Sequence, residues 1–153
     1  MKNKLDNVDF SILSILTEDA QTPYTEVAKR LIISPGTVHA RMKKMRDLGL
    51  IIGATLNVDY AKMDWKFTVF LGIDLIISTQ YKQVISSLMM VKEVVKIHHV
   101  TGKYDIFIKM HAKDSQHYRA VYQDEILTID GIKGIESFIS VEQNLTRHIQ
   151  FLE

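Results

Sequence analysis

The sequence predicts an α+β protein: an N-terminal three-helix helix-turn-helix domain, an extended linker strand and a C-terminal ferredoxin-like βαββαβ domain. Apolar residues recur at helical spacing up to Gly49, and a strict apolar–polar alternation begins at Phe67. After that alternation, strand and helix patterns follow in the order strand, helix, strand, strand, helix, strand. We therefore expect domains at residues 1–49 and 67–153, joined by a linker and hinge at 50–66.

The composition is that of a folded soluble protein. Of its 153 residues, 46% are hydrophobic and 24% charged, and 19 basic and 18 acidic side chains give a net charge of +1. The absence of cysteine excludes a disulfide framework and a thiolate metal site. No apolar run has the length of a membrane span or the pattern of a signal peptide. We expect a cytoplasmic protein with no cofactor and no metal site.

The first two helices precede residue 32. Asp6 and Asp9 have the spacing of a capping box, and apolar residues follow at helical intervals. Thr22 and Pro23 then form a cap and first-turn pair for the second helix. Ile32 stands where helix-turn-helix turns usually carry glycine, and a β-branched residue at positive φ costs on the order of 1–2 kcal/mol. Either this turn is remodelled or Ile32 keeps a negative φ.

The third helix is the segment that points to a partner. Ser34 and Pro35 form an N-cap and first-turn pair, and Gly49 is a C-cap. One helix face is apolar, and the face beside it carries only small or polar groups. Residues 29–46 contain six basic residues and no acidic one, which predicts binding to double-stranded DNA. The predicted DNA-binding residues are Ser34, Pro35, Gly36, Thr37, Val38, Arg41, Lys43 and Lys44.

The residues of the third helix differ in their expected contacts. Ser34 and Thr37 are near the helix N-terminus and are assigned to phosphates or base edges, and Arg41 to a guanine edge or a phosphate. Lys43 and Lys44 are expected on backbone phosphates, which position a protein without specifying a sequence. The alternative is that these charges form only a solvated helix face.

The C-terminal half alternates between strand and helix patterns. The predicted elements are a strand over 67–77, a helix from Thr79, strands over 94–100 and 104–112 joined by a turn at Gly102 and Lys103, a helix capped by Asp114 or Ser115, and a strand over 135–141. The order gives two βαβ halves, with both helices on one face of the sheet.

The helices of such a sheet leave its other face uncovered. The covered face is predicted to comprise Leu71, Ile106, Ile108, Ile135, Ile139 and Val141. By alternation, the open face carries Phe70, Phe107 and Phe138. Three phenylalanines would form a larger apolar patch than soluble monomers usually tolerate, so we expect a homodimer with its two-fold axis between the sheets. The alternative is that such aromatics are ordinary and the C-terminal tail covers them.

Four ordered segments carry a resemblance to a known family: LDNVDFSIL, ISPGTVHARMKKM, LIIGATLNVD and TGKYDIFIKM. They resemble the Lrp/AsnC (feast/famine) family of bacterial and archaeal transcription regulators, most closely its asparagine-regulator branch. The resemblance covers essentially the whole chain, although Asp64 replaces a glycine that is typical of the linker. It implies a DNA-binding regulator whose C-terminal domain binds a small effector, usually an amino acid, and assembles as dimers, often into octamers.

The same resemblance implies an effector site between dimers. The implied residues are Thr101, Gly102, Tyr104, Asp105, Gly134, Ile135, Glu136 and Ser137. A tight turn at Gly102 exposes backbone N–H groups that can hold a carboxylate, and Asp105 can meet an ammonium group. On the sequence alone, Gly102 is an ordinary hairpin glycine and Asp105 a solvated strand residue; the resemblance favours the site.

The predicted function is a sequence-specific, DNA-binding transcriptional regulator whose DNA affinity or assembly is modulated by an amino-acid effector. An amino-acid-binding regulatory subunit of an enzyme and an architectural DNA-binding protein are the alternatives. An enzyme is disfavoured because the chain has no nucleophile elbow, cysteine nucleophile, HExxH pair or phosphate loop.

Overall fold

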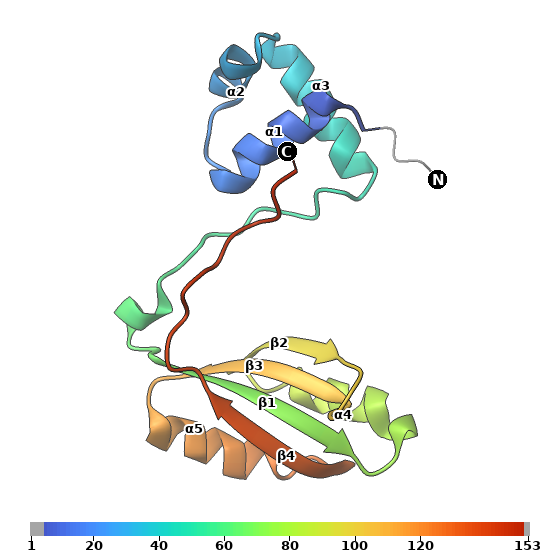
Figure 1. Cartoon of the computed structure of the whole chain (residues 1–153), viewed down its shortest axis with the longest axis vertical. Coiled ribbons are helices and arrows are strands. Elements are labelled where there is room, and N and C mark those ends of the chain that lie inside the picture. The colour runs from blue at the N-terminus through green and yellow to red at the C-terminus, as the bar shows by residue number, and fades with distance from the viewer. Residues whose placement is uncertain (1–4, 152–153) are drawn as a thin grey trace. The chain divides into compact units, whose positions relative to one another are not determined.

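A computed structural model describes residues 5–151 of the chain (Figure 1). Its internal contacts divide it into two compact units. The helical unit comprises the chain up to Asn57 together with the tail from Leu145, and the sheet unit runs from Val58 to Asn144. The tail, which we expected in the C-terminal domain, thus packs with the helices. Within residues 5–151, no helix is long and apolar enough to cross a membrane.

The described residues of the helical unit form three α-helices, α1 (Asn7–Glu18), α2 (Tyr24–Leu31) and α3 (Pro35–Asp47). They form the predicted helix-turn-helix arrangement around a small core. The fully or nearly fully buried core residues are Ile12, Leu13, Val27, Ala28, Val38, Met42 and Met45. In α3, Val38, Met42 and Met45 recur every three or four positions, so burying them fixes which face of that helix points inward.

Local hydrogen bonds set the ends of α1 and α3 where the sequence predicts them. The Asp6 carboxylate accepts the backbone N–H of Asp9 at 3.0 Å, and the Asp9 carboxylate accepts that of Asp6 at 3.2 Å, which completes the capping box. At α3, the Ser34 hydroxyl accepts the backbone N–H of Thr37 at 3.1 Å. Gly49 follows α3 with φ +69°, a left-handed conformation that is typical after a helix.

The second helix and the turn after it differ from the simplest expectation. Pro23, rather than Thr22, occupies the N-cap of α2. Ile32 adopts the left-handed conformation, with φ +55°, and its side chain is 93% exposed. The turn therefore keeps the glycine-type geometry although the backbone at Ile32 is strained. Because the Ile32 side chain is exposed, no apolar burial offsets this strain.

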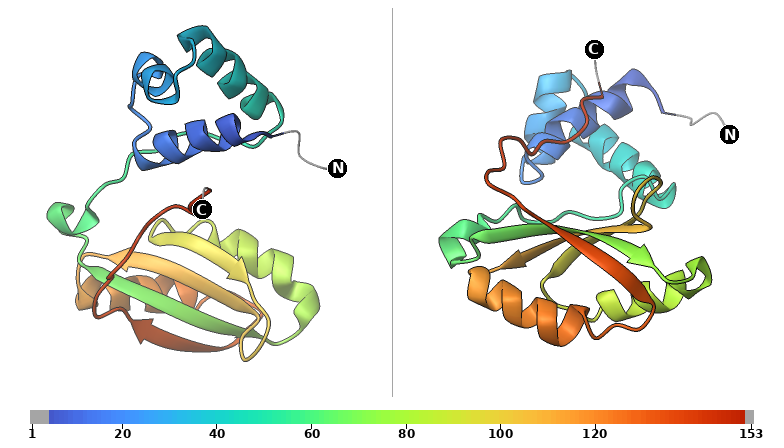
Figure 2. Two further views of the ribbon diagram at one scale, coloured as in Figure 1. Left: turned by 45° about the horizontal axis from the view of Figure 1, so that its top comes forward. Right: turned by 60° about the horizontal axis from the view of Figure 1, so that its bottom comes forward.

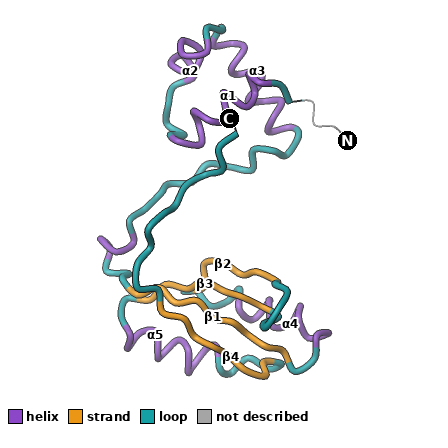
Figure 3. Tube along the Cα trace, viewed as in Figure 1, coloured by secondary structure: helices purple, strands orange, loops and turns teal. Residues whose placement is uncertain are grey.

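The described residues of the sheet unit form one four-stranded antiparallel sheet in the order β2-β3-β1-β4. In chain order, its main elements are β1 (Phe67–Leu75), α4 (Tyr81–Leu88), β2 (Val94–His99), β3 (Ile106–Ala112), α5 (Ser115–Val121) and β4 (Ile132–Ile139). A π-helical turn, Tyr122–Ile126, extends α5. α4 and α5 lie on the same face of the sheet (Figures 2 and 3). This arrangement confirms the predicted ferredoxin-like fold.

The linker differs from the predicted strand. Residues 51–59 form no strand in the described chain, because a strand needs a hydrogen-bonded neighbour and the described sheet consists of β1 to β4. A 3₁₀ turn, Tyr60–Met63, follows, and the Asp59 carboxylate caps it. Asp64 ends the turn with φ +64°, in the conformation for which glycine is the usual residue.

Strand alternation determines the core of the sheet unit. Leu71, Ile106 and Ile108 are fully buried against the helices, as predicted. Ile139 and Val141 were predicted there wrongly: they are 57% and 99% exposed. The reason is that β4 is an edge strand that runs over 132–139 rather than 135–141, so Ile139 is its last residue and Val141 lies beyond it.

The opposite face carries an aromatic cluster, which we define as Phe70, Tyr104, Phe107 and Phe138. The Phe107 ring centroid lies 6.0 Å from those of both Phe70 and Phe138 and 6.3 Å from that of Tyr104. Gly72 makes room for Tyr104, since a Cβ atom at Gly72 would lie 2.6 Å from the tyrosine ring. Phe138 is 39% exposed.

Gly72→Ala should therefore destabilise the protein by about 1–3 kcal/mol, because the methyl group must displace the Tyr104 ring or shift the strand. The measurement is the free energy of unfolding from urea titration. Gly134→Ala is the matched control, since the nearest atom to its Cβ would lie at 3.9 Å. Equal stability of the two variants would show that the Tyr104 packing does not require glycine.

Candidate DNA interface and ligand site

The exposed face of α3 borders a groove on the helical unit. The groove has a volume of about 610 Å³ and is lined by Asp6, Ser34, Gly36, Thr37, Ala40, Arg41 and Lys44. The Ser34 and Thr37 hydroxyls lie 2.9 Å apart at the helix N-terminus. Small and hydroxyl-bearing side chains at this end leave the backbone accessible, and the cationic side chains follow one or two turns later. The groove can therefore approach a polyanion closely.

The basic side chains of α3 have acidic or hydroxyl partners that a count along the sequence does not reveal. Arg41 Nη1 lies 2.7 Å from Asp6 Oδ1 and 2.8 Å from Asp9 Oδ1, and Lys44 Nζ lies 2.9 Å from Asp9 Oδ2. We call these four side chains the acid–base cluster. Asp9 is completely buried, whereas the Asp6 side chain is 54% exposed. The cluster joins the first turn of α1 to the middle of α3.

The cluster keeps its carboxylates ionised. The hydrogen bonds from Arg41 hold the pKa of Asp6 below its ordinary value of 3.8. Burial alone would raise the pKa of Asp9, but hydrogen bonds from Arg41 and Lys44 outweigh burial and leave that pKa lowered. In return, the hydrogen bonds to Asp6 and Asp9 raise the pKa of Arg41. The two carboxylates and the Arg41 guanidinium are therefore charged at neutral pH.

The remaining predicted DNA-binding residues lie at different depths. Pro35 and Gly36 are exposed in the first turn of α3. Val38 is fully buried in the helical core, so its side chain packs rather than forming part of the exposed surface. Lys43 is exposed and pairs with Asp47 at 3.0 Å. Asp6 and Asp9 were missed as partners of Arg41 and Lys44 because their sequence signal, the capping box, indicates only a helix start.

A second site lies in the sheet unit beside the start of α4. It is a pocket of about 440 Å³ lined by Leu75, Ser78, Thr79, Tyr81, Lys82, His99 and Asp105. Asp105 Oδ2 accepts the backbone N–H of Leu75 at 2.8 Å, which fixes the carboxylate at the pocket wall. The pocket thus combines one cationic and one anionic side chain with hydroxyl groups, a composition suited to a small zwitterion.

The effector residues that the family resemblance implies lie in different parts of the sheet unit. Thr101 and Gly102 lie exposed in the turn before β3, where Gly102 has φ +115°. Tyr104 belongs to the aromatic cluster, and both its hydroxyl and Lys103 hydrogen-bond to Glu136. The bond from Lys103 is the main cause of the lowered pKa of Glu136.

The other members of that set lie along β4. Gly134 pairs with Asp74 across the ladder between β1 and β4, and Ile135 packs against the sheet core. The Ser137 hydroxyl lies 2.7 Å from that of Tyr118 on α5. Only Asp105 of the predicted residues lines the pocket.

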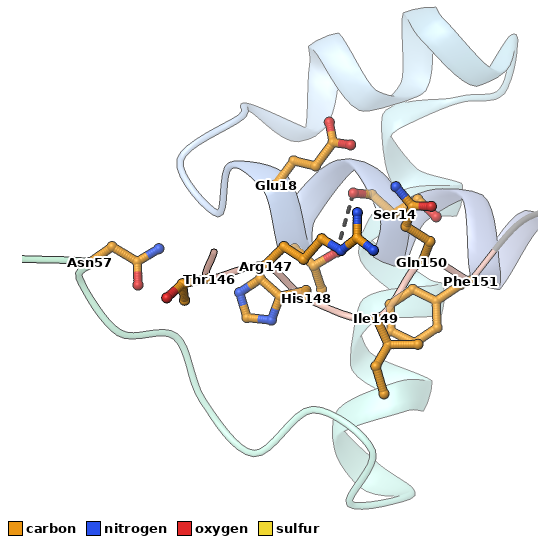
Figure 4. Close-up of a pocket in the computed structure, with 10 residues that line it drawn as sticks. Ser14, Glu18, Asn57, Thr146, Arg147, His148, Ile149, Gln150 and Phe151 are labelled. Atoms are coloured by element: carbon orange, nitrogen blue, oxygen red, sulfur yellow. Dashed lines mark hydrogen bonds between the residues drawn. The ribbon is translucent and has the colours of Figure 1, made fainter. Parts of the chain in front are cut away.

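The helical unit has a further concavity under the C-terminal tail (Figure 4). Its lining comprises Ser14, Thr17 and Glu18 of α1, Asn57, and residues 146–151. Phe151 stacks on Phe10 with ring centroids 6.4 Å apart. This concavity shares no lining residue with the groove beside α3.

Comparison with known families matches both units. Residues 5–52 match a winged helix-turn-helix DNA-binding domain, and residues 68–148 match an Lrp/AsnC ligand-binding domain.

Individual relatives match nearly the whole chain. The regulatory protein AsnC of Haemophilus influenzae is 37% identical over 148 residues, which are 97% of this chain and 99% of that protein. AsnC of Escherichia coli K12 is 35% identical over 151 residues, 98% of this chain and 99% of that protein. The solved structure of E. coli AsnC superposes with a TM-score of 0.90 at 34% identity, covering 95% of this chain and 98% of that one. A Neisseria meningitidis regulator solved with L-Met superposes with a TM-score of 0.89 at 19% identity, covering 94% of each chain.

A helix-turn-helix unit joined to a ligand-binding unit defines a ligand-responsive, DNA-binding transcriptional regulator. The chain belongs to the Lrp/AsnC family of such regulators.

Acidification should destabilise the helical unit through the acid–base cluster. Because the folded-state pKa values of Asp6 and Asp9 are lowered, the cluster contributes stability above the unfolded-state value near 3.8 and loses it as the pH falls through the folded-state values. The measurement is urea unfolding between pH 6 and pH 3, monitored by helical circular dichroism. Asp9→Asn should be less stable at pH 6 and depend less on pH below 4. An unaltered pH dependence in this variant would contradict the assignment.

Proposed function

We propose that this regulator binds DNA as a homodimer through α3, that dimers assemble into octamers, and that an amino acid binding to the sheet unit changes the DNA affinity. The proposal includes a cytoplasmic location and no catalytic role. The observation that carries it is the groove beside α3, where small groups at a helix N-terminus adjoin cationic side chains. Such a surface admits a phosphate backbone and the edges of bases together.

The DNA contact is divided along α3. Ser34 and Thr37 lie at the N-terminal end, where recognition helices contact base edges. Lys43, with its side chain 78% exposed, is one turn from the groove and can reach a phosphate. The N-terminal end of α3 thus contacts base edges, through Ser34, Pro35, Gly36 and Thr37. The positive charges that attract phosphates come from Arg41, Lys43 and Lys44.

Selection from a random duplex library should enrich a pseudo-palindrome with half-sites about one helical turn apart, or a multiple of it. Thr37→Val, which removes one hydroxyl, should relax the preference at one position of each half-site by about tenfold. Lys43→Ala should instead weaken binding to all duplexes and reduce the salt slope by about 1. Sequence-independent binding by the wild type would contradict specific recognition.

The aromatic cluster provides the proposed dimer surface. Four aromatic rings on the uncovered face of one sheet form a continuous apolar patch, and the same patch on a second copy is self-complementary about a two-fold axis. A dimer also provides two recognition helices, as a pseudo-palindromic site requires.

The wild-type protein should therefore sediment as a dimer or a larger assembly at micromolar concentration. Phe138→Glu should shift the mass towards the monomer, because it introduces two buried charges at the two-fold interface. Ile77→Glu is the control, since Ile77 is 55% exposed and lies outside the aromatic cluster. A monomeric wild type, or equal masses for the two variants, would contradict the proposed surface.

The ligand pocket supports an amino-acid effector. Asp105 is held at its wall by the Leu75 N–H and can accept a hydrogen bond from an ammonium group, and Lys82 supplies a cation for a carboxylate. The turn at Thr101 and Gly102 lies outside the pocket lining, and its exposed backbone N–H groups are a separate candidate contact for a carboxylate. The L-Met complex of the Neisseria regulator supports the same class of ligand.

Asp105→Asn should abolish amino-acid binding while leaving the fold intact, because an asparagine oxygen can still accept the Leu75 N–H. Binding is measured by calorimetry against a panel of the common amino acids, with thermal unfolding as the folding check. Asp124→Asn removes the same charge from an exposed position outside the pocket and should bind normally. Equal affinity in the two variants would exclude Asp105 as the ammonium partner.

A further inference from the structure

This inference rests on the proposed function, in which the groove beside α3 contacts DNA: one acidic side chain lies in that groove. Asp6 lines this groove together with Thr37, Arg41 and Lys44, and its side chain is 54% exposed. A carboxylate at this position repels a phosphate backbone, so its presence on a DNA-binding surface requires an explanation beyond helix capping. Asparagine or serine would cap α1 equally well without a charge.

The geometry shows which group the Asp6 charge acts on. Arg41 Nη1 lies 2.7 Å from Asp6 Oδ1 and 2.8 Å from Asp6 Oδ2, so one guanidinium nitrogen meets both carboxylate oxygens. The same nitrogen lies 2.8 Å from Asp9 Oδ1. The Arg41 side chain, only 25% exposed, is thus drawn towards α1 by two acids.

The two acids have different roles. Asp9 is fully buried, accepts from Arg41 and Lys44 and belongs to the capping box, so it is a fixed structural anchor. Asp6 is at the surface, where a phosphate oxygen could take its place beside Arg41. A DNA phosphate must therefore compete with Asp6 for the guanidinium.

We propose that Asp6 is a specificity-determining residue that limits sequence-independent DNA binding by holding Arg41 away from phosphates. Any duplex offers phosphates, whereas only the correct sequence also offers base-edge contacts to the N-terminal end of α3. Binding to random DNA then lacks the full contribution of Arg41. The ratio of specific to non-specific affinity is higher than the basic residues of α3 alone would give.

The test compares the full-length protein with Asp6→Asn, which retains the cap but loses the charge. Asp19→Asn is the matched control: its carboxylate also accepts a backbone N–H, from Gln21 at 2.9 Å, which asparagine can preserve. Asp19 lies at the other end of α1, about 20 Å away at 1.5 Å per residue, which exceeds the screening length of about 8 Å at 0.15 M salt. Affinities for a random-sequence duplex and for the library-selected operator are measured over a salt series.

For Asp6→Asn we expect about fivefold tighter binding to the random duplex, as for one added charge–phosphate pair, and a salt slope steeper by about 0.9. The operator should gain less, so the specificity ratio falls. In an Arg41→Ala background, Asp6→Asn should have a much smaller effect, because only the direct repulsion between Asp6 and phosphates remains.

Two results would overturn the proposal. One is an Asp6→Asn protein with the same affinity and salt slope as Asp19→Asn. The other is weaker binding to the random duplex, which would mean that Asp6 presents Arg41 to DNA. Circular dichroism checks the fold, and Asp6→Ser, also a neutral cap, replaces Asp6→Asn if the latter fails to fold.

Discussion

The sheet of this regulator has helices on one face only, and the architecture of the C-terminal unit depends on this asymmetry. Alternate residues of β1 and β3 are buried beneath α4 and α5, while their neighbours form the aromatic cluster on the open face. Gly72 lacks a side chain at the point where Tyr104 crosses the sheet. In the proposed function, this apolar face forms a two-fold dimer interface, which would pair the recognition helices.

In the helical unit, the acidic partners of the basic side chains of α3 affect its surface as much as the number of basic side chains does. The sequence of α3 contains many cations, but the start of α1 supplies them with two carboxylate partners, the exposed Asp6 and the buried Asp9. The buried Asp9 fixes α1 against α3, and the exposed Asp6 shares Arg41 with any phosphate that approaches. The fold thus uses one capping box both to start a helix and to set the electrostatics of the neighbouring groove.

Features that depend on neighbours in sequence were predictable. The Ser34 cap, the Asp6 and Asp9 capping box and the alternation in β1 follow from local hydrogen bonding and periodicity, and the structure confirms them. Features that depend on distant contacts were not: Arg41 and Asp6 are 35 residues apart, and no local pattern reveals their pairing. Tyr104 was assigned to the effector site from the family resemblance, and its packing over Gly72 is a further contact that sequence spacing does not show. Ile139 was wrongly predicted to be buried, because alternation shows which face of a strand a side chain lies on but not whether a helix covers that position.

The measurement that tests the account most directly is the affinity of the selected operator with and without the amino acid that binds the sheet unit. If the units are coupled, saturating amino acid changes this affinity by about 5- to 150-fold, a coupling free energy of about 1–3 kcal/mol. By linkage, the operator must change the amino-acid affinity by the same factor. An operator affinity that stays constant while calorimetry shows the amino acid bound would contradict ligand control of DNA binding.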